Sequence, residues 1–356
     1  MKLVKTKDAV GHILCHDITQ IIPGEYKGPV FKKGHIVCEE DIDVLLSIGK
    51  EHLYVWENDE NVLHENDAAL ILKDICMGDD SSMSFSEPSE GKIEIKSNID
   101  GLLKVNTSKL NKINSLGEMM IATVHGDFAV KKGDKIAGTR IIPLAIEKEK
   151  MEKAKDVIGS DHLLKVLPFA RKKYAIVTTG SEVYKGLIED KFGPVIQDKM
   201  NEFDNEFMGQ KIVDDNPEMI TKSILEFIDN GAEMVLCSGG MSVDPDDRTP
   251  KAIKDTGANV VTYGAPTLPG AMLMIAYLGK DGKQIPIVGL PGCVMYAKRT
   301  AFDLILPRML ADEIINADDI SKLGEGGMCL NCETCHFPNC GFGKQRSWLW
   351  IINYRM

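Results

Sequence analysis

The pattern of hydrophobic and polar positions changes after Pro168. From there on, short apolar runs alternate with stretches of helical pattern, which is typical of a parallel sheet with helical crossover connections. Strands are predicted over 174–179, 211–213, 234–237 and 285–290, and the run 234–237 is apolar throughout, as in a strand covered on both faces. Helices are predicted between and after them, over 193–208, 217–229, 249–256 and up to Leu310.

Local signals support two of these helix boundaries. Asn216 precedes Pro217, which places an N-cap residue before a proline at the first helical position. Asn230 and Gly231 end the same pattern. Residues 168–312 are therefore predicted to form an α/β domain with a mostly parallel sheet.

Elements in the first half of the chain are shorter. Residues 1–77 predict a small α/β region, with strands over 9–14 and 34–37 and a helix from Asp41 to Ile48. The stretch 78–91, rich in Asp, Ser and Glu with Pro88, predicts a loop or a linker. Residues 92–146 predict a β-rich subdomain, and the charged stretch 147–155 predicts a helix.

The net charge of the chain excludes some classes of ligand. The 356 residues carry 42 Lys and Arg against 53 Asp and Glu, a net charge of −11, which argues against binding to nucleic acid or to an anionic membrane. The start of the chain lacks a signal-peptide pattern, and no apolar run reaches the roughly 18 residues of a membrane span. We therefore expect a cytoplasmic protein in which local backbone N–H groups hold any small anion.

Candidate ligand-binding residues cluster where the predicted strands end, the place at which open α/β sheets bind ligands. Adjacent glycines after a strand let the backbone approach a ligand, and their N–H groups can cradle a phosphate. Each segment alone reads as a tight turn, but together they predict a site. Its members are Thr179, Gly180, Ser181, Ser238, Gly239, Gly240, Arg248, Thr249, Pro291 and Gly292.

The order of these motifs resembles the molybdenum-cofactor biosynthesis domain shared by molybdopterin adenylyltransferases, molybdopterin molybdenumtransferases and competence-damage-type pyrophosphatases. The resemblance runs from Tyr174 to Leu310 and includes Asp190, Gly193-Pro194 and Pro269-Gly270. It implies a three-layer α/β domain that binds molybdopterin at the carboxyl ends of the strands. It also implies a homo-oligomer.

Two acidic residues carry the catalytic prediction. By position, Asp215 and Asp247 match acids associated with activity in the adenylyltransferase branch, and such carboxylates could hold Mg²⁺ against phosphates. Asp214 and Asp246 are the alternatives one residue away. Two positions depart from the family: Ser181 stands where many relatives have Asp, and Cys293-Val294 follows the Pro-Gly turn where relatives commonly have a residue and then Pro.

Three functions remain open. The first is an enzyme that inserts molybdate into molybdopterin or its adenylated form, or that adenylates molybdopterin with Mg-ATP. The second, which the two departures favour, is a non-catalytic carrier that delivers molybdopterin to a client molybdoenzyme. The third is a nucleotide pyrophosphatase, against which the segment 8–18 argues because it resembles the opening of molybdenumtransferases.

The tail, residues 324–345, is a separate compositional region. Its spacing, C-x2-C-x2-C-x4-C, predicts a thiolate site for Zn²⁺ or an iron–sulfur cluster, and a redox disulfide or an unligated tail are the alternatives. The other five cysteines stand singly, as reduced thiols do in a reducing compartment. The predicted ligands are Cys329, Cys332, Cys335 and Cys340.

Overall fold

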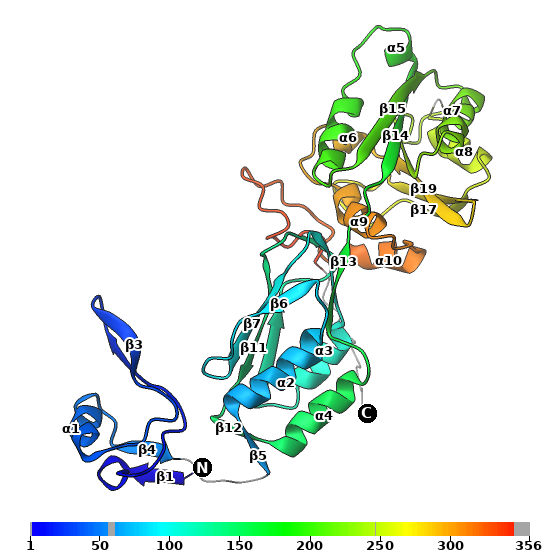
Figure 1. Ribbon diagram of the computed structural model, residues 1–356. Coiled ribbons are helices and arrows are strands. Elements are labelled where there is room, and N and C mark those ends of the chain that lie inside the picture. Colours follow the sequence, from blue (N-terminus) through cyan, green and yellow to red (C-terminus); the bar gives the residue numbers. More distant parts are fainter. Residues whose placement is uncertain (1, 56–60, 246, 345–356) are drawn as a thin grey trace, which may run out of the picture. The chain divides into compact units, whose positions relative to one another are not determined.

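The computed structural model describes residues 2–55, 61–245 and 247–344 (Figure 1). Contacts within the chain divide it into two units. The first unit comprises Met1–Ile99, Leu103–Val124 and Val130–Val166, and the second comprises Asp100–Leu102, His125–Ala129 and Leu167–Met356. Each unit has a hydrophobic core of its own.

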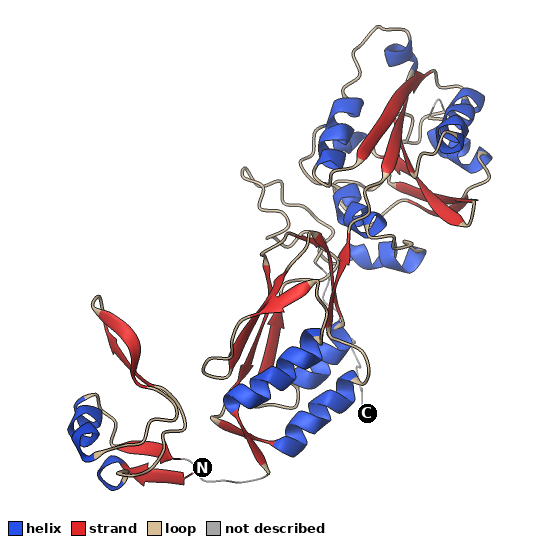
Figure 2. Cartoon of the chain, viewed as in Figure 1, coloured by secondary structure: helices blue, strands red, loops and turns tan. Residues whose placement is uncertain are grey.

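A six-stranded sheet forms the centre of the second unit (Figure 2). Its strand order is β15-β14-β16-β19-β18-β17. The first four strands are parallel, and β18 runs antiparallel to both β19 and β17. The predicted mostly parallel sheet is confirmed. The bounds are β14 Lys173–Thr179, β15 Glu206–Val213, β16 Met234–Ser238, β17 Asn259–Tyr263, β18 Met274–Lys280 and β19 Lys283–Leu290.

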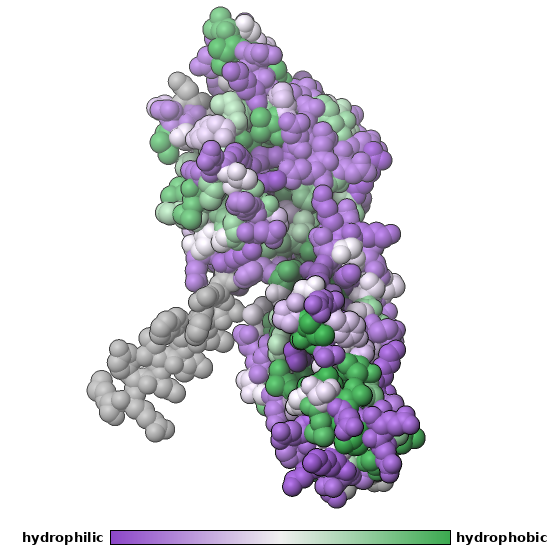
Figure 3. Space-filling view, turned by 90° about the vertical axis from the view of Figure 1, so that its left-hand side faces the viewer, coloured by the Kyte–Doolittle hydropathy of each residue, from purple (hydrophilic) through white to green (hydrophobic). Residues whose placement is uncertain are grey.

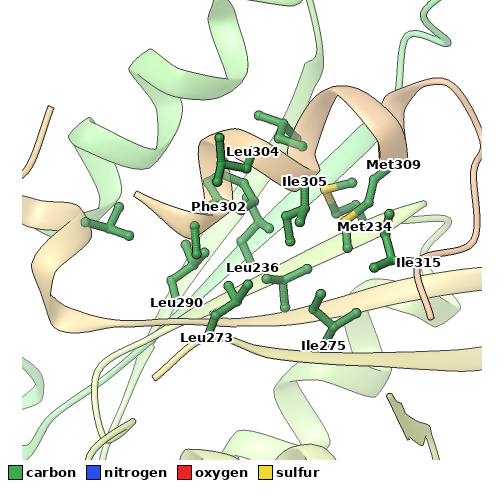
Figure 4. Close-up of a cluster of buried hydrophobic side chains, with 14 of the residues drawn as sticks. Met234, Leu236, Leu273, Ile275, Leu290, Phe302, Leu304, Ile305, Met309 and Ile315 are labelled. Carbon is green, nitrogen blue, oxygen red and sulfur yellow. The ribbon is translucent and has the colours of Figure 1, made fainter. Parts of the chain in front are cut away.

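Helices cover both faces of this sheet and give three layers. On one face, α9 (Ala301–Leu310) packs Phe302 and Ile305 against Leu236 in a core that Figure 4 shows, and α6 (Phe192–Asn201) adds Ile196. On the other face, α7 (Pro217–Asp229) and α8 (Thr249–Asp255) enclose the second half of the core. The three-layer α/β prediction is confirmed. Short helical elements complete the unit: α5 Ser181–Tyr184, η2 Gly292–Met295, α10 Ala317–Ser321 and η3 Lys322–Gly324.

Several predicted boundaries in the second unit are wrong. The helix predicted over 193–208 ends at Asn201, because 206–213 pairs with β14 as the edge strand β15. The strand predicted over 211–213 is the end of that longer strand. The helix predicted to reach Leu310 begins only at Ala301, since Thr300 caps it by accepting the N–H of Phe302. Neither β17 nor β18 was predicted.

The N-terminal part of the first unit contains two pairs of strands. The strands predicted over 9–14 and 34–37 are wrong: Gly11 and Gly34 turn the backbone at positive φ, and only isolated bridges remain, at Ile13–Ile36 and Leu14–Val55. The predicted helix is confirmed as α1. The elements are β1 Lys2–Lys5, η1 Thr6–Asp8, β2 Ile18–Ile22, β3 Tyr26–Phe31, α1 Glu39–Ser47 and β4 His52–Val55.

Residues 61–166 surround a second core. In it, Leu72 of α2 is buried with Ile93 and Ile95 of β7, and β6 extends the same sheet. The stretch 78–91 is therefore a loop within this core, interrupted by the short β6, and not a linker between two domains. The elements are β5 Val62–His64, α2 Glu65–Met77, β6 Met83–Phe85, β7 Lys92–Ser97, β8 Gly101–Val105, α3 Thr107–Asn114, β9 Met119–Thr123, β10 Ala129–Val130, β11 Lys135–Ile141, β12 Ala145–Glu147, α4 Lys148–Ile158 and β13 Leu164–Pro168.

The surface is mixed in character. On the face drawn in Figure 3, hydrophobic residues form separate green patches within a largely hydrophilic surface, as is normal for folded proteins. Within the described ranges, every helix is too short or too polar to cross a bilayer.

Candidate functional site

The register of the sheet brings four strand ends to one level. Thr178 of β14 pairs with Ser238 of β16, and Ser238 pairs with Leu290 of β19. On the other side, Thr179 pairs with Val213 of β15. The loops that follow these strands therefore start side by side, at what we call the carboxyl edge: residues 179–181, 213–215, 238–241 and 290–292. The sheet thus assembles the segments that the sequence singled out.

A glycine turn follows β16. Gly239 and Gly240 both have positive φ, at +85° and +55°, and a Cβ on Gly239 would collide with the backbone carbonyl oxygen of Thr179. A Cβ on Gly240 would lie 2.9 Å from the hydroxyl oxygen of Thr249. Only glycine allows the backbone to pass this close to the neighbouring strand. The predicted close-approach turn is therefore present at this edge.

Three of the predicted ligand residues are buried and engaged within the protein. The Thr249 hydroxyl donates to the Gly239 carbonyl at 2.8 Å, so in its 3.1 Å contact with Thr179 it accepts the proton of the Thr179 hydroxyl. The hydroxyls of Ser238 and Thr178 lie 3.1 Å apart. These hydroxyls connect the loops to one another, which fixes the shape of the glycine turn.

Carboxylates gather beside this turn. The Oδ2 atom of Asp215 accepts the N–H of Ser181 at 2.8 Å, and Asp214 accepts the N–H of Asp215 at 2.9 Å. Burial raises the pKa of Asp215 against the opposing effect of the Ser181 hydrogen bond, and the charges of Asp214, Glu182 and Asp247 raise it further. Asp247 is thus close enough for its charge to act on Asp215. Asp246 lies outside the described residues.

The donor set can be tested for Mg²⁺. Carboxylate oxygens are the ligands that Mg²⁺ prefers, and a cation would relieve the repulsion that raises the pKa of Asp215. In the part of the chain that the structure describes, no three His, Cys, Asp or Glu side chains converge as a metal-holding group. Mg²⁺ commonly takes one or two carboxylates and completes its shell with water and substrate phosphates. The residues fit that kind of site.

The remaining predicted residues differ in exposure. Arg248 is exposed beside Asp247, Pro291 is buried, and Gly292 is exposed at the start of η2. Gly180 and Ser181 are half-buried, and Gly180 has an extended, positive-φ backbone (φ 141°).

Gln210 of β15 is a polar residue that sequence reasoning missed, and it bonds to Thr178 just before this edge. Its side-chain amide donates to the hydroxyl of Thr178 at 2.8 Å and to Oδ2 of Asp190 at 2.6 Å. Asp190 also accepts the N–H groups of Phe192 and Gly193, which starts α6. A glutamine inside a strand is a signal for such a network, but it required β15 to be recognised as a strand.

The tail cysteines differ in exposure. Cys329 and Cys340 are half-buried, and Cys332 and Cys335 are exposed, all as free thiols. Since no metal-holding group of three side chains occurs in the described residues, the metal site of the tail stays a prediction.

Comparison with known proteins agrees with this geometry. Residues 175–311 match the family described as a probable molybdopterin binding domain. Residues 3–57 match a domain of unknown function.

Two curated relatives have names that refer to molybdenum cofactor biosynthesis or to molybdopterin. A molybdenum cofactor biosynthesis bifunctional protein of Synechococcus elongatus is 34% identical over 83 residues, which is 23% of this chain and 26% of that protein. A molybdopterin molybdenumtransferase of Staphylococcus epidermidis is 23% identical over 345 residues, which is 90% of this chain and 76% of the enzyme. The chain thus spans about a quarter of the first relative and about three quarters of the second.

Solved structures cover different shares of this chain. The tungsten cofactor synthesizing protein MoaB from Pyrococcus furiosus is 21% identical, with a TM-score of 0.33, over 39% of this chain and 91% of that one. A molybdenum cofactor biosynthesis protein from the same organism is 14% identical, with a TM-score of 0.24, over 87% of this chain and 63% of that one. From the match over 175–311, together with the three layers and the motifs at their edge, we conclude that this domain belongs to the molybdopterin-binding family of molybdenum cofactor biosynthesis.

Proposed function

We propose that the chain binds molybdopterin at the carboxyl edge and inserts molybdate into it or into its adenylated form. The observation that carries this proposal is the alignment of four strand ends, which puts the glycine turn next to Asp215 and Asp247. Support for this step over adenylation comes from the relative named a molybdopterin molybdenumtransferase, which aligns over 90% of this chain.

The residues have separate roles in this proposal. Backbone N–H groups of the turn at Gly239 and Gly240 bind the terminal phosphate of the pterin, because neither glycine has a side chain that would keep the phosphate away from the backbone. Asp215 and Asp247 hold Mg²⁺, which when bound offsets the negative charge of phosphate and molybdate oxygens. Exposed Arg248 pairs with the incoming anion.

The test is an anaerobic equilibrium titration of molybdopterin into the full chain. We expect micromolar or tighter binding by the wild type and at least about tenfold weaker binding by the Asp215→Ala/Asp247→Ala variant, since tenfold corresponds to about 1.4 kcal/mol. Asp229→Ala is the matched control, because Asp229 is an acid at the end of α7 that pairs with Lys280 away from this edge. Absence of binding by the wild type would overturn the proposal.

A carrier function is the second candidate. The observation that favours it is η2, in which Cys293 and Val294 occupy a short 3-10 turn directly after the Pro291-Gly292 loop. Incubation with adenylated molybdopterin and molybdate separates the two functions: release of AMP indicates the enzyme, and tight binding without release indicates the carrier. Incubation with molybdopterin and Mg-ATP tests the adenylation step in the same way.

A further inference from the structure

Residues 326–343 form a loop whose two ends meet, and we call it the cysteine loop. The N–H of Gly343 donates to the carbonyl of Gly326 at 2.9 Å. A Cβ on Gly326 would lie 2.6 Å from the carbonyl oxygen of Lys344, so the two ends touch backbone to backbone. A loop closed at its base confines its side chains to a small volume. All four tail cysteines lie inside it.

The cysteines occupy the loop in two pairs. Cys329 and Cys340 each stand three residues from their end of the loop, and both are half-buried against the core that α9 covers. Cys332 and Cys335 lie toward the tip and are exposed. Two of the cysteines are therefore packed against the core, and the other two lie in the exposed part of the loop.

Packing and hydrogen bonds hold the base of the loop. Leu268 donates its N–H to Gly327 and accepts the N–H of Cys329, both at 2.8 Å. Phe337 lies against Phe342, with ring centroids 6.3 Å apart, and Phe342 is only 3% exposed. The chain that carries Cys329 and Cys340 is thus anchored to the second unit.

Charges around the loop suit an anionic centre. Four thiolates around a divalent metal ion carry a net charge of −2. The loop itself contains one acid and no lysine or arginine. Basic groups reach it from outside: Nζ of Lys298 donates to the carbonyl of Glu333 at 2.7 Å, and the guanidinium of Arg299 lies 5.1 Å from the ring centroid of Phe337. Arg299 also pairs with Glu202 and Asp303, so part of its charge is already balanced.

We propose that the cysteine loop binds one metal centre through the thiolates of Cys329, Cys332, Cys335 and Cys340. Because no three metal-ligating side chains converge in the described residues, binding requires the tip to fold toward the base. Each thiol releases its proton as its sulfur binds, so four protons leave for each centre formed. The same thiolate chemistry suits a single Zn²⁺ or, with iron and sulfide supplied, an iron–sulfur cluster.

The test is metal analysis of the full chain after anaerobic purification and reconstitution with Zn²⁺ or with iron and sulfide. We expect about one centre per chain. Zinc without sulfide or visible absorption identifies the first form, and iron with sulfide and visible absorption identifies the second. Cys332→Ser and Cys335→Ser, at exposed positions where serine fits, should each lose most of the metal. Cys38→Ser is the matched control, since Cys38 is exposed in the first unit and serine can still cap α1.

Thermal unfolding gives a second measurement, which does not require the fraction of metal-bound protein to be known. Metal should raise the unfolding temperature of the wild type and leave that of the two tip variants unchanged, because metal bound only to the folded loop stabilises it. The proposal is overturned if the reconstituted wild type holds neither metal, if the tip variants retain it, or if the anaerobic protein contains a Cys332–Cys335 disulfide. These readouts need no pterin, so their outcome is independent of the proposed function.

Discussion

Gly239 occupies a position where strain and collision act together. Its φ is +85°, and any Cβ there meets the backbone of Thr179, which cannot move without disturbing β14. By contrast, Gly231 has φ +95° at the end of α7, with open space around its Cβ position. An alanine at Gly231 would cost only the strain of a positive φ, whereas an alanine at Gly239 would cost that strain and a steric collision as well.

Substitution of each glycine by alanine tests this distinction. We expect Gly231→Ala to lower the free energy of unfolding by about 1 kcal/mol, the cost of a left-handed conformation. Gly239→Ala should cost about 3 kcal/mol or more, because overpacking adds to that strain. Urea unfolding of both variants gives the comparison, and equal losses would contradict the collision.

Asp215 is a residue whose ionisation opposes folding. Burial raises its pKa, so the folded state retains the proton at pH values where the unfolded state, with an ordinary value of 3.8, has lost it. Its contribution to stability is present below the unfolded pKa and is lost as the pH rises through the folded pKa.

Asp215→Asn should therefore gain stability relative to the wild type as the pH rises from about 4 to neutrality, because the amide stays neutral and can still accept the N–H of Ser181. Unfolding temperatures of both proteins across this range give the difference. Addition of Mg²⁺ at neutral pH should narrow it by stabilising the wild type. A difference that does not change with pH would show that the ionisation has no such effect.

Among the secondary-structure elements, the start of α7 is a helix end that depends on neighbouring residues alone, and it was predicted correctly. Asn216 was predicted to begin a helix, and its side chain accepts the N–H groups of Glu218 and Met219 at 2.9 and 3.2 Å. That cap depends on four consecutive residues and needs no partner from elsewhere.

Removal of this N-cap side chain should lower the free energy of unfolding by an amount typical of helix caps. Asn216→Ala should destabilise the second unit by about 1 kcal/mol, because two N–H groups at the start of α7 lose their acceptor. Asn216→Ser retains an acceptor and should cost less than half of that. Chemical denaturation monitored by circular dichroism measures both, and equal losses would contradict the role of the side chain.

Strand predictions failed where pairing is not local. The first residues of β15, 206–208, were predicted as the end of a helix and only 211–213 as a strand, yet Lys173–Thr179 pairs with the whole segment and stabilises the extended form. The apolar run around Ala276 gave no indication that β18 folds back on β19 in antiparallel pairing.

The residues of the candidate site were easier to predict than the sheet that carries them, since glycines, acids and prolines at strand ends are visible in the sequence. Gln210, inside β15, fell between the predicted helix and the predicted strand and was therefore not singled out.

At the scale of the whole molecule, two units with separate cores predict two unfolding events. Leu72 is fully buried in the first core and Ile224 in the core beneath α7. Alanine at either position should cost about 2–5 kcal/mol through lost burial and a cavity. Calorimetry should show two unfolding transitions. Leu72→Ala should lower the midpoint temperature of one, and Ile224→Ala that of the other. A single transition that both variants shift equally would show that the units unfold together.

The joined ends of the cysteine loop have a consequence for how such chains change over evolution. Because Gly326 and Gly343 already touch through their backbones, a deletion of the residues between them leaves a short turn and needs no rerouting of the flanking chain. A single genetic insertion or deletion can therefore add or remove the whole set of cysteines, while the strand ends that face the ligand keep their register. Related chains with and without this loop are expected to share the same sheet.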